Sequence, residues 1–584
     1  MKKEKNGRAR GGQVQSSQVQ SGQVKNGRIK NSPARPGAAR IPNRQKDMNP
    51  APALVLTLLA SALLWYRHLP ALNLKSAQLW LFVILMLVLY NALTFVLASC
   101  MNRRAQYGPS LLLLAAVTAV FLLALLASSR LFHAKAYSQI LQVSEGTTED
   151  IPSEDGSGSI ALMDTASAEK LGDRKIGSLS SVVSQFNVGS YTQIDYQGSP
   201  VKVASLRYDG FFKWKGNRAD GVPGYVLVDP VAMEAEYVAL EKGMTYVPSA
   251  WFSENLRRHL RLAYPTYMFT NTHFEIDEDG RPWYVAPVMT HTIGLFGGTQ
   301  ITGVVLTDPT TGDMAEYPAG DIPQWVDVVY SGDLICDQFN DAAQLMNGFI
   351  NSIFGQKDCR RVTTMPGEDE DDYSADYGYV SKDGDIWIYT GVTSVNGDSS
   401  NLGFILSNER TEETRYIACA GADEFSAMSS AEGEVQEKGY YASFPSLINI
   451  EHIPTYIMVL KDASGLVKMY AAVNVEQYNL VATAATQKGC IDKYRALMNG
   501  DISTEEAADG DAAAETDLSL YTKRTVTVRK LEKIDRGGDT YLYLLDGEGN
   551  IYHARYADVI RMMLTEEGDT IELLVYGDRF ALEE

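Results

Sequence analysis

Three uncharged apolar runs stand out near the N-terminus, over residues 51–66, 76–102 and 105–129. A helix needs about 20 apolar residues to cross roughly 30 Å of hydrocarbon, and the second and third runs reach that length. The shorter first run either spans with help from residues 69–74 or lies at the bilayer surface as a re-entrant or interfacial segment. The pattern predicts a membrane domain over residues 51–130 with about three transmembrane helices.

Beyond this domain, apolar strands alternate with polar turns and amphipathic helices. Three segments share an apolar strand, a turn at Asp229, Asp308 or Asn408, and a polar return strand ending in Tyr. Their sequences are GYVLVDPVAMEAEY, GVVLTDPTTGDMAEY and GFILSNERTEETRY. Asp and Asn favour such turns because their side chains bond the local backbone. A looser fourth copy, PTYIMVLKDASGLVKMYAAVNV, has DASG as its turn.

Helical patterns alternate with these hairpins, over residues 253–263, 334–354, 424–438 and 486–498. We therefore predict tandem α+β modules, each a helix plus an antiparallel hairpin, over residues 160–498. Polar and acidic stretches at 131–159 and 499–517 predict linkers. Residues 518–584 read almost wholly as strands and predict a small β-barrel of OB or SH3-like size.

The hairpin words also carry a resemblance to known proteins. RPWYVAPV followed by GVVLTDPTTGDMAEY resembles PepSY-like modules, in which a strand reading WYV pairs with one reading VxVDAxTGE. The words NGFINSIFGQK, YTGVTSVNGDSSNLGF and GLVKMYAAVNVEQYNLVAT resemble a Firmicutes family of multi-pass membrane proteins, over most of residues 160–500. The resemblance implies PepSY-like repeats in a bacterial cell envelope and carries over no catalytic residue. PepSY modules are mostly associated with binding or inhibiting secreted peptidases, or with sensing.

Charge is distributed unevenly along the chain. The first 50 residues form a low-complexity, disordered tail with 12 Lys and Arg against Glu4 and Asp47, whereas the whole chain has a net charge of -20. Basic segments stay in the cytoplasm, which places the tail and the Arg103–Arg104 loop there. Three crossings then place the large C-terminal region outside the cytoplasm of a bacterial plasma membrane, whereas two would leave it inside. A body this acidic excludes nucleic acid as a partner.

No stretch reads as a complete catalytic, nucleotide-binding or metal-binding motif. The segment IGLFGGT lacks the spacing of phosphate-binding loops and predicts a hairpin loop, with Leu295 and Phe296 at its tip as candidates to enter a partner or the membrane surface. The seven histidines lack zinc-site spacing, and the acidic run at 368–372 lacks the ligand order of a calcium loop. We expect no catalytic residue, no cofactor and no metal.

One concentrated basic patch interrupts the acidic body, in the segment NLRRHLRL. Helical spacing buries Leu256, Leu260 and Ala263 and exposes the arginines on the other face. The exposed residues are Arg257, Arg258 and Arg261. They either dock an anionic polymer, lipid headgroups or an acidic partner, or form a solvated face paired with carboxylates.

These features predict a membrane-anchored, non-enzymatic binding or scaffold protein of the cell envelope. Its partners would be the lipid bilayer and an envelope protein or anionic polymer. A transmembrane sensor that passes ligand binding to the basic tail is one alternative. A hydrolase is another, and it requires a deep pocket with clustered His, Asp or Ser at a module boundary.

Overall fold

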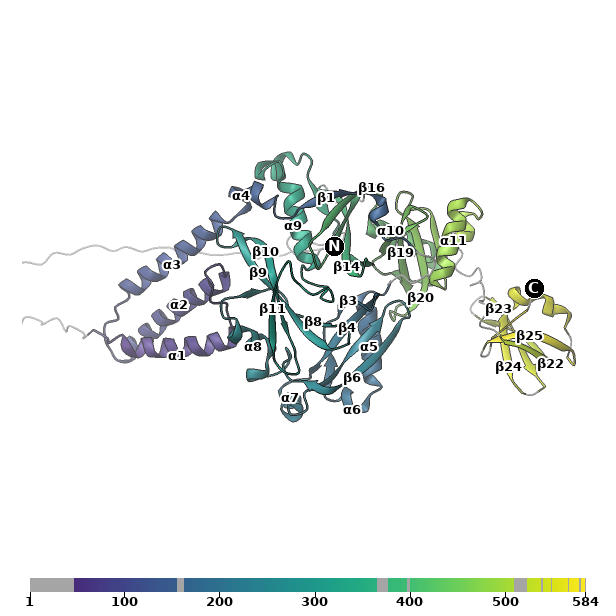
Figure 1. Ribbon diagram of the computed structural model, residues 1–584, viewed down its shortest axis with the longest axis horizontal. Coiled ribbons are helices and arrows are strands. Elements are labelled where there is room, and N and C mark those ends of the chain that lie inside the picture. Colours follow the sequence, from purple (N-terminus) through teal and green to yellow (C-terminus); the bar gives the residue numbers. More distant parts are fainter. Residues whose placement is uncertain are drawn as a thin grey trace, which may run out of the picture.

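The computed structural model describes residues 47–154, 162–364, 377–395, 400–508, 522–536, 539–547, 549–565, 567–576 and 579–582. The basic tail up to residue 46, the acidic run at 368–372 and residues 509–517 of the linker predicted at 499–517 lie outside the described residues. A helical anchor comes first, followed by four sheets with their helices and then a closed barrel (Figure 1).

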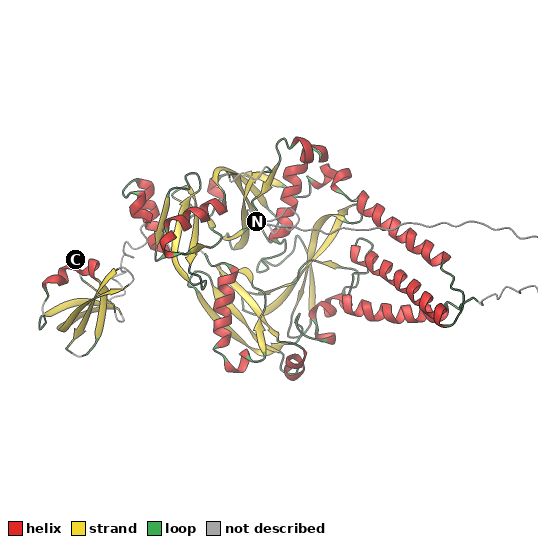
Figure 2. Ribbon diagram, turned by 180° about the vertical axis from the view of Figure 1, so that it is seen from behind, coloured by secondary structure: helices red, strands yellow, loops and turns green. Residues whose placement is uncertain are grey.

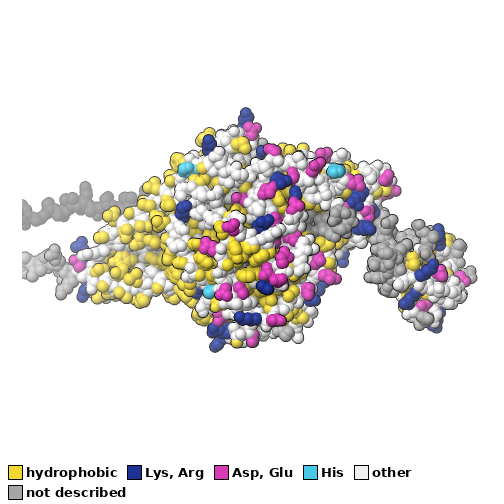
Figure 3. All heavy atoms as spheres, viewed as in Figure 1, with side chains coloured by type: hydrophobic (Ala, Val, Ile, Leu, Met, Phe, Trp, Pro, Cys, Tyr) yellow, Lys and Arg dark blue, Asp and Glu magenta, His cyan; other side chains and the backbone are white. Residues whose placement is uncertain are grey.

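The anchor consists of α1 (Ala51–His68), α2 (Ala77–Cys100) and α3 (Gly108–Ala127). The last two are long and apolar enough to cross a membrane, with mean hydropathies of 2.5 and 2.7. Only 17% and 6% of their apolar windows are buried, unlike a core helix of a soluble protein. Figure 3 shows the same exposed hydrophobic covering over the anchor, with charged side chains gathered on the body. The helices α2 and α3 therefore indicate membrane association, and the crossing of the membrane by α1 stays a prediction.

The three helices run up, down and up. The backbone N–H of Met48 donates to the carbonyl of Arg104 (3.0 Å), so the start of α1 lies beside the α2–α3 loop. At the other end, the N–H of Leu72 donates to the carbonyl of Pro265 (2.8 Å), which places the α1–α2 loop against the body. The start of α1 and the end of α3, which leads into the body, therefore lie at opposite ends of the bundle (Figure 1).

Four sheets follow one another with the same strand order: the third strand is central, pairing with the first, second and fourth, and the fifth pairs with the fourth. The first contains β2 (Phe186–Val188), β3 (Thr192–Tyr196), β4 (Ser199–Tyr208), β5 (Val222–Asp229) and β6 (Glu234–Met244). The second contains β7 (Met268–Phe269), β8 (His273–Ile276), β9 (Pro282–Ile293), β10 (Gly297–Thr307) and β11 (Met314–Pro318). The third contains β12 (Arg360–Val362), β13 (Gly378–Lys382), β14 (Asp385–Ser394), β15 (Ser400–Asn408) and β16 (Thr414–Ala422). The fourth contains β17 (Tyr441–Ala442), β18 (Ser446–Ile450), β19 (Ile453–Lys461), β20 (Val467–Asn474) and β21 (Val481–Ala484).

A helix precedes each sheet and a further one follows the last: α5 (Thr165–Gly177), α8 (Leu256–Ala263), α9 (Gly332–Leu345), α10 (Glu424–Glu434) and α11 (Gln487–Asn499). Each begins at a polar cap whose side chain accepts a backbone N–H three residues on, which stabilises the helix start. The caps are Asp164, Asn255, Ser331, Asp423 and Thr486. The last four helices lie where helical segments were predicted, although α9 ends at Leu345 rather than at the predicted residue 354, whereas α5 was not predicted. Short helices are α4 (Arg130–Tyr137), α6 (Ser180–Val183), α7 (Phe211–Asn217) and α12 (Thr504–Ala508).

The predicted Asx turns join the fourth and fifth strands of the first three sheets. Asp229, Asp308 and Asn408 each accept backbone N–H groups two and three residues on, at 2.7–3.3 Å. The equivalent residue of the fourth sheet is Asn474, which accepts the N–H of Gln477 at 2.8 Å. The predicted DASG turn instead joins β19 to β20, so the fourth hairpin was misaligned by one strand. Its Asp462 also accepts local backbone N–H groups, from Ser464 and Leu466, so turn chemistry alone did not distinguish this turn from the one at Asn474.

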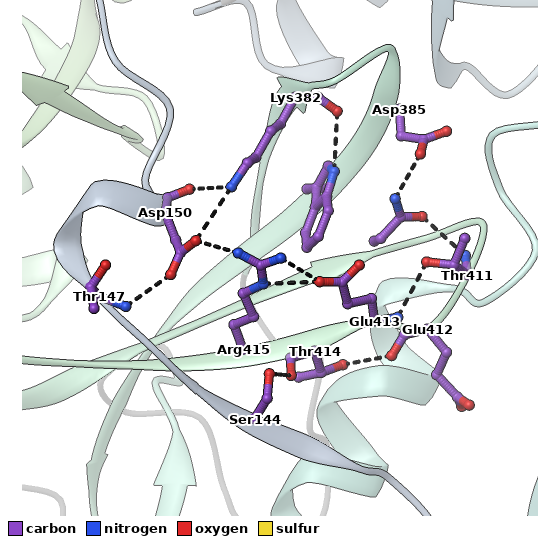
Figure 4. Close-up of polar contacts among 12 residues, drawn as sticks. Ser144, Thr147, Asp150, Lys382, Asp385, Thr411, Glu412, Glu413, Thr414 and Arg415 are labelled. Atoms are coloured by element: carbon purple, nitrogen blue, oxygen red, sulfur yellow. Dashed lines mark hydrogen bonds and ion pairs between the residues drawn. The ribbon is translucent and has the colours of Figure 1, made fainter.

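Residues 131–154 do not behave as the predicted linker. They form α4, the strand β1 (Val143–Gly146) parallel to β16, and a 3₁₀ turn. At that turn Asp150 contacts Lys382 and Arg415 of the third sheet (Figure 4). These ion pairs fix the chain that leaves the anchor onto the sheet surface.

Neighbouring modules share their hydrophobic cores, so the body is continuous (Figure 2). The ring of Tyr225 in the first sheet lies 5.7 Å from Phe274 in the second. Phe404 in the third lies 5.9 Å from Tyr456 in the fourth. Burial of such side chains between sheets gives the body its main stabilisation.

The C-terminal residues form a closed five-stranded barrel in the order β22-β23-β24-β26-β25. A 3₁₀ segment, Tyr556–Leu564, separates β24 from β25, and the interior has its own apolar core. The strands are β22 (Thr522–Arg536), β23 (Asp539–Asp546), β24 (Ile551–Arg555), β25 (Thr570–Tyr576) and β26 (Arg579–Ala581).

Two glutamates in the body make stability depend on pH. Burial raises the pKa of Glu412 and of Glu424 from 4.5 to about 7. The folded state therefore holds more protons than the unfolded chain between about pH 4.5 and 7, and stability falls as pH rises through that window. We expect the free energy of unfolding to drop by about 1–3 kcal/mol per group from pH 5 to pH 8. Thermal melts of the wild type and of the E412Q/E424Q double variant should show a steeper pH slope in the wild type; equal slopes would contradict the assignment.

Candidate functional site

The predicted basic patch lies against the end of the anchor rather than on an open face. Arg261, predicted to be exposed, is only 9% exposed, whereas Ala263, predicted to be buried, is exposed. The Arg261 guanidinium donates to the carbonyls of Leu69 (3.1 Å), Tyr264 (3.2 Å) and Tyr267. Burial, reinforced by the positive charge of Arg257, lowers the pKa of Arg261 to about 10. The prediction was wrong because α8 packs on the α1–α2 loop, which helical spacing does not reveal.

The other two arginines contact the last turn of α1. Arg257 donates to the carbonyl of His68 at 3.1 Å, and the Arg258 guanidinium lies 4.2 Å from the centre of the Tyr66 ring. The last carbonyls of a helix lack intrahelical donors and carry partial negative charge, which cations stabilise. The patch therefore binds the chain's own anchor, and of the three side chains only Arg257 is exposed.

The glycine-rich segment forms the β9–β10 hairpin loop, as predicted. Its tip packs on the anchor: Ser128 Oγ accepts the N–H groups of Leu295 and Phe296 at 3.0 and 3.2 Å. The Phe296 ring lies 5.4 Å from Phe121 of α3. A Cβ at Gly297 would come within 2.5 Å of the Ser128 carbonyl oxygen, so the close approach requires glycine. Both tip side chains are half-buried, and their contact is internal.

Two further polar contacts join the anchor to the body, one just after α3 and one just before α2. Arg130 pairs with Asp341 of α9 through two bonds of 2.5 and 3.0 Å. Lys75, just before α2, donates to the carbonyl of His291 at 2.5 Å. We call these contacts, with those of the basic helix α8 and the β9–β10 tip, the anchor junction. It fixes the second module and α9 to the body-facing ends of the three anchor helices.

A second feature lies inside the body, where the first three sheets meet. A cavity of about 210 Å³ opens between α5, β3, β4, β8, β13 and the start of α9. Its lining includes Lys202, Glu409, His273, Tyr191, Tyr377 and Tyr379. Pockets at such boundaries, with a few convergent polar groups, are the usual places for ligands.

Lys202 is a buried cation without an anionic partner in contact. The side chain projects from β4 and is 2% exposed. Among the described residues, its Nζ donates only to Thr165 Oγ1, at a long 3.4 Å, and lies 5.4 Å from the centre of the Tyr379 ring. Burial lowers the pKa of Lys202 to about 8, although the negative charges of Asp164 and Glu409 oppose that shift.

Glu409 is the opposite charge in the same cavity. Its carboxylate accepts the N–H of Gly332 at the start of α9, while Oε2 is buried without a hydrogen-bond partner. Burial raises the pKa of Glu409 well above its usual range, reinforced by the charge of Glu275. Within the described part of the chain, Glu409 and Lys202 form no ion pair with each other or with a third residue. Desolvated ionisable groups that line a cavity are candidates for a functional site.

Beneath the cavity lies a buried carboxylate that organises the boundary between the second and third modules. Glu275 accepts the N–H groups of Asp327 and Val328, both at 3.0 Å, and bonds His273 Nε2 at 2.8 Å. Asp327 in turn accepts the N–H of Asp195 in the first sheet at 2.8 Å. Burial, and then the charge of Glu275, raise the pKa of Asp327 well above its usual range.

The cavity meets one requirement of a hydrolase, because it is a pocket at a module boundary and contains a histidine. A second requirement is a hydroxyl or thiol nucleophile in contact with that histidine, and the described residues do not provide one. Among the described residues, His273 bonds only Glu275, and Ser331 is engaged in capping α9. No described hydroxyl or thiol is therefore positioned for activation by His273. The described residues also contain no group of three or more His, Cys, Asp or Glu arranged to hold a metal ion.

Sequence reasoning did not single out the cavity residues. Lys202 interrupts the apolar strand PVKVASL, where a lone charge at a buried position is a usable signal. Glu409 follows the Asx turn of the third hairpin and looks like any polar turn residue. Nothing in the sequence places the two beside one cavity.

No protein-family model matches the chain, and no curated protein matches it. Among solved structures, an exo-β-1,3-galactanase from Clostridium thermocellum aligns at 8% identity and a TM-score of 0.18, over 68% of this chain and 64% of that one. An ancestral GH74 enzyme aligns at 11% and 0.15, over 63% and 42%, and a Trypanosoma rangeli sialidase at 7% and 0.16, over 75% and 58%. The chain thus spans less than two thirds of each enzyme. TM-scores this low do not indicate a common fold, and the activities of these enzymes do not transfer to this chain.

Proposed function

We propose that the chain is a membrane-anchored, non-enzymatic binding protein of the bacterial cell envelope. The observation that carries the proposal is the anchor junction, because it holds a four-module body on one end of an apolar helical bundle. Buried Arg261, the Lys75–His291 bond and the Ser128–hairpin contact join the ends of α1, α2 and α3, in that order, to the body. Such a body presents its surface to a partner at a fixed height above the bilayer.

The modules are PepSY-like under this proposal, and the barrel is OB-like. The WYV strand of the second module, β9, pairs with β10, whose end carries the Asx turn at Asp308, and the same strand order recurs four times. In the barrel, β24 pairs with β26 in parallel, and a helical segment precedes β25, an arrangement that supports an OB-like fold more than an SH3-like one.

Three crossings, with the basic tail in the cytoplasm, would place the body outside it. The up-down-up course of α1–α3 supports this topology, because the start of α1 and the end of α3 lie at opposite ends of the bundle. In addition to α2 and α3, α1 would also cross the membrane. Its 18 residues span about 27 Å of helix length at 1.5 Å per residue.

Integral membrane association is the first property to test. Membranes from cells expressing the full chain should retain it after washing at pH 11, and detergent should release it. As a matched control, a variant with Leu→Lys changes at Leu85 and Leu122, both exposed on the anchor, should insert poorly and shift to the wash. Release of the unaltered chain at pH 11 would rule out a membrane anchor.

A transmembrane sensor is the second candidate, favoured by one specific arrangement. The second module contacts the anchor through the β9–β10 tip, and its residues Asn271, His273 and Pro287 line the cavity. Occupancy of the cavity is thereby linked through one sheet to the end of α3. Deleting residues 1–45 separates the two functions: a pure binding protein should keep its cellular effect, whereas a sensor should lose it.

A further inference from the structure

The inter-module cavity brings together two buried ionisable groups of opposite type, Lys202 and Glu409. Lys202 and Glu409 are both almost fully buried and line the same cavity, yet they are not in contact with each other. Burying a charge without a partner is costly, and natural proteins pair such groups or neutralise them. The Lys202 ammonium has two N–H donors beyond the one directed at Thr165, and Glu409 Oε2 has no partner, so hydrogen-bonding capacity remains on both groups.

We propose that this cavity binds a small zwitterion that carries both a carboxylate and an ammonium group, of the size of a free amino acid. The ligand carboxylate would accept hydrogen bonds from Lys202 Nζ and from the Thr165 hydroxyl. Its ammonium group would donate to Glu409 Oε2. A single molecule would thus supply both missing partners, and the inference does not depend on the side of the membrane.

Size and lining restrict the ligand further. The volume of about 210 Å³ lies below the ~300–1,000 Å³ of sites that enclose drug-sized molecules, so a single amino acid fits better than a peptide. Tyr191, Tyr377 and Tyr379 give the lining aromatic faces, which suit an apolar or aromatic side chain. The Tyr191 hydroxyl is buried without a partner and offers one more bond.

Competing ligands fit less well. A neutral sugar would satisfy hydrogen bonds but leave both charges uncompensated. A metal ion would need several anionic or imidazole ligands together, and the described residues contain no such group. A simple carboxylate would pair with Lys202 and leave Glu409 alone, and a simple amine would do the reverse.

Binding is tested on the detergent-solubilised full chain by thermal shift and titration calorimetry. The probes are the individual L-amino acids, and the comparison set is the matching amines, carboxylic acids and neutral monosaccharides. We expect at least one amino acid to raise the melting temperature in a saturable manner, with deaminated and decarboxylated analogues at least tenfold weaker. If no amino acid binds, or if a neutral sugar or a single-charge analogue binds as tightly, the proposal is overturned.

Two variants locate the site. K202M and E409Q each keep side-chain size, and each should weaken the amino acid at least tenfold while leaving the protein folded, because each removes one of the two groups that would pair with the ligand. K202M should still distinguish amines from neutral compounds, and E409Q should still distinguish carboxylates. As a matched control, K170M changes an exposed lysine on α5 outside the cavity and should leave affinity unchanged. Unchanged affinity in both cavity variants would show that the amino acid binds elsewhere and would contradict the assignment.

Discussion

Replacing Arg261 with methionine is expected to loosen the body from its anchor. The guanidinium is the donor that the Leu69, Tyr264 and Tyr267 carbonyls share, and methionine keeps the apolar stem while removing every bond. Leaving buried carbonyls unsatisfied costs about 1–3 kcal/mol each, partly relieved by water, so we expect a loss of about 3–5 kcal/mol. Thermal unfolding of the purified protein measures the loss, and limited proteolysis in the 69–76 loop should accelerate.

The matched control for this change is R257M. Arg257 lies on the same helix, is exposed and makes one bond to the carbonyl of His68, so its loss should cost less than about 1 kcal/mol. If R261M melts like the wild type, or if both variants lose the same stability, Arg261 does not hold the junction.

The second large effect is expected at Glu275. This carboxylate is fully buried and bonds two backbone N–H groups and one imidazole, which joins the second module to the segment leading into the third. In E275A three donors lose their acceptor and a small cavity opens. We expect a loss of about 3–5 kcal/mol, moderated because Asp327 no longer faces a neighbouring negative charge.

Urea unfolding of E275A against E278Q tests this expectation. Glu278 is exposed at the next hairpin turn, and its substitution should shift stability by less than about 0.5 kcal/mol. A loss below 1 kcal/mol in E275A would mean that water or a side-chain rearrangement replaces the buried acceptor.

Local chemistry explains which features could be predicted from the sequence. Apolar runs gave the anchor helices, and Asx signatures at Asp229, Asp308 and Asn408 gave three of four hairpins, because both signals depend only on nearby residues. The position of the fourth hairpin was predicted wrongly because this part of the chain contains two Asx turns, at Asp462 and Asn474. The helix α5 was missed because its segment, TASAEKLGDRKIG, has few large apolar residues to mark a helical face.

Contacts between distant residues could not be predicted in the same way. Arg261 reads as a surface arginine until α8 is placed on the α1–α2 loop, 192 residues away in the chain. Phe296 reads as an exposed loop tip until Ser128 and Phe121 meet it. Lys202 and Glu409 become a site only when the first and third sheets share a cavity, which no periodicity encodes.

The proposed envelope role is tested most directly by determining on which side of the membrane the body lies. Ala463, exposed in the β19–β20 turn, and Gln106, exposed in the α2–α3 loop, are each changed to Cys in a chain whose five native cysteines are replaced. Intact cells are then treated with a membrane-impermeant maleimide, and lysed cells serve as the reactivity control. We expect A463C to react in intact cells and Q106C to react only after lysis. Protection of A463C until lysis would place the body in the cytoplasm and contradict a binding role in the cell envelope.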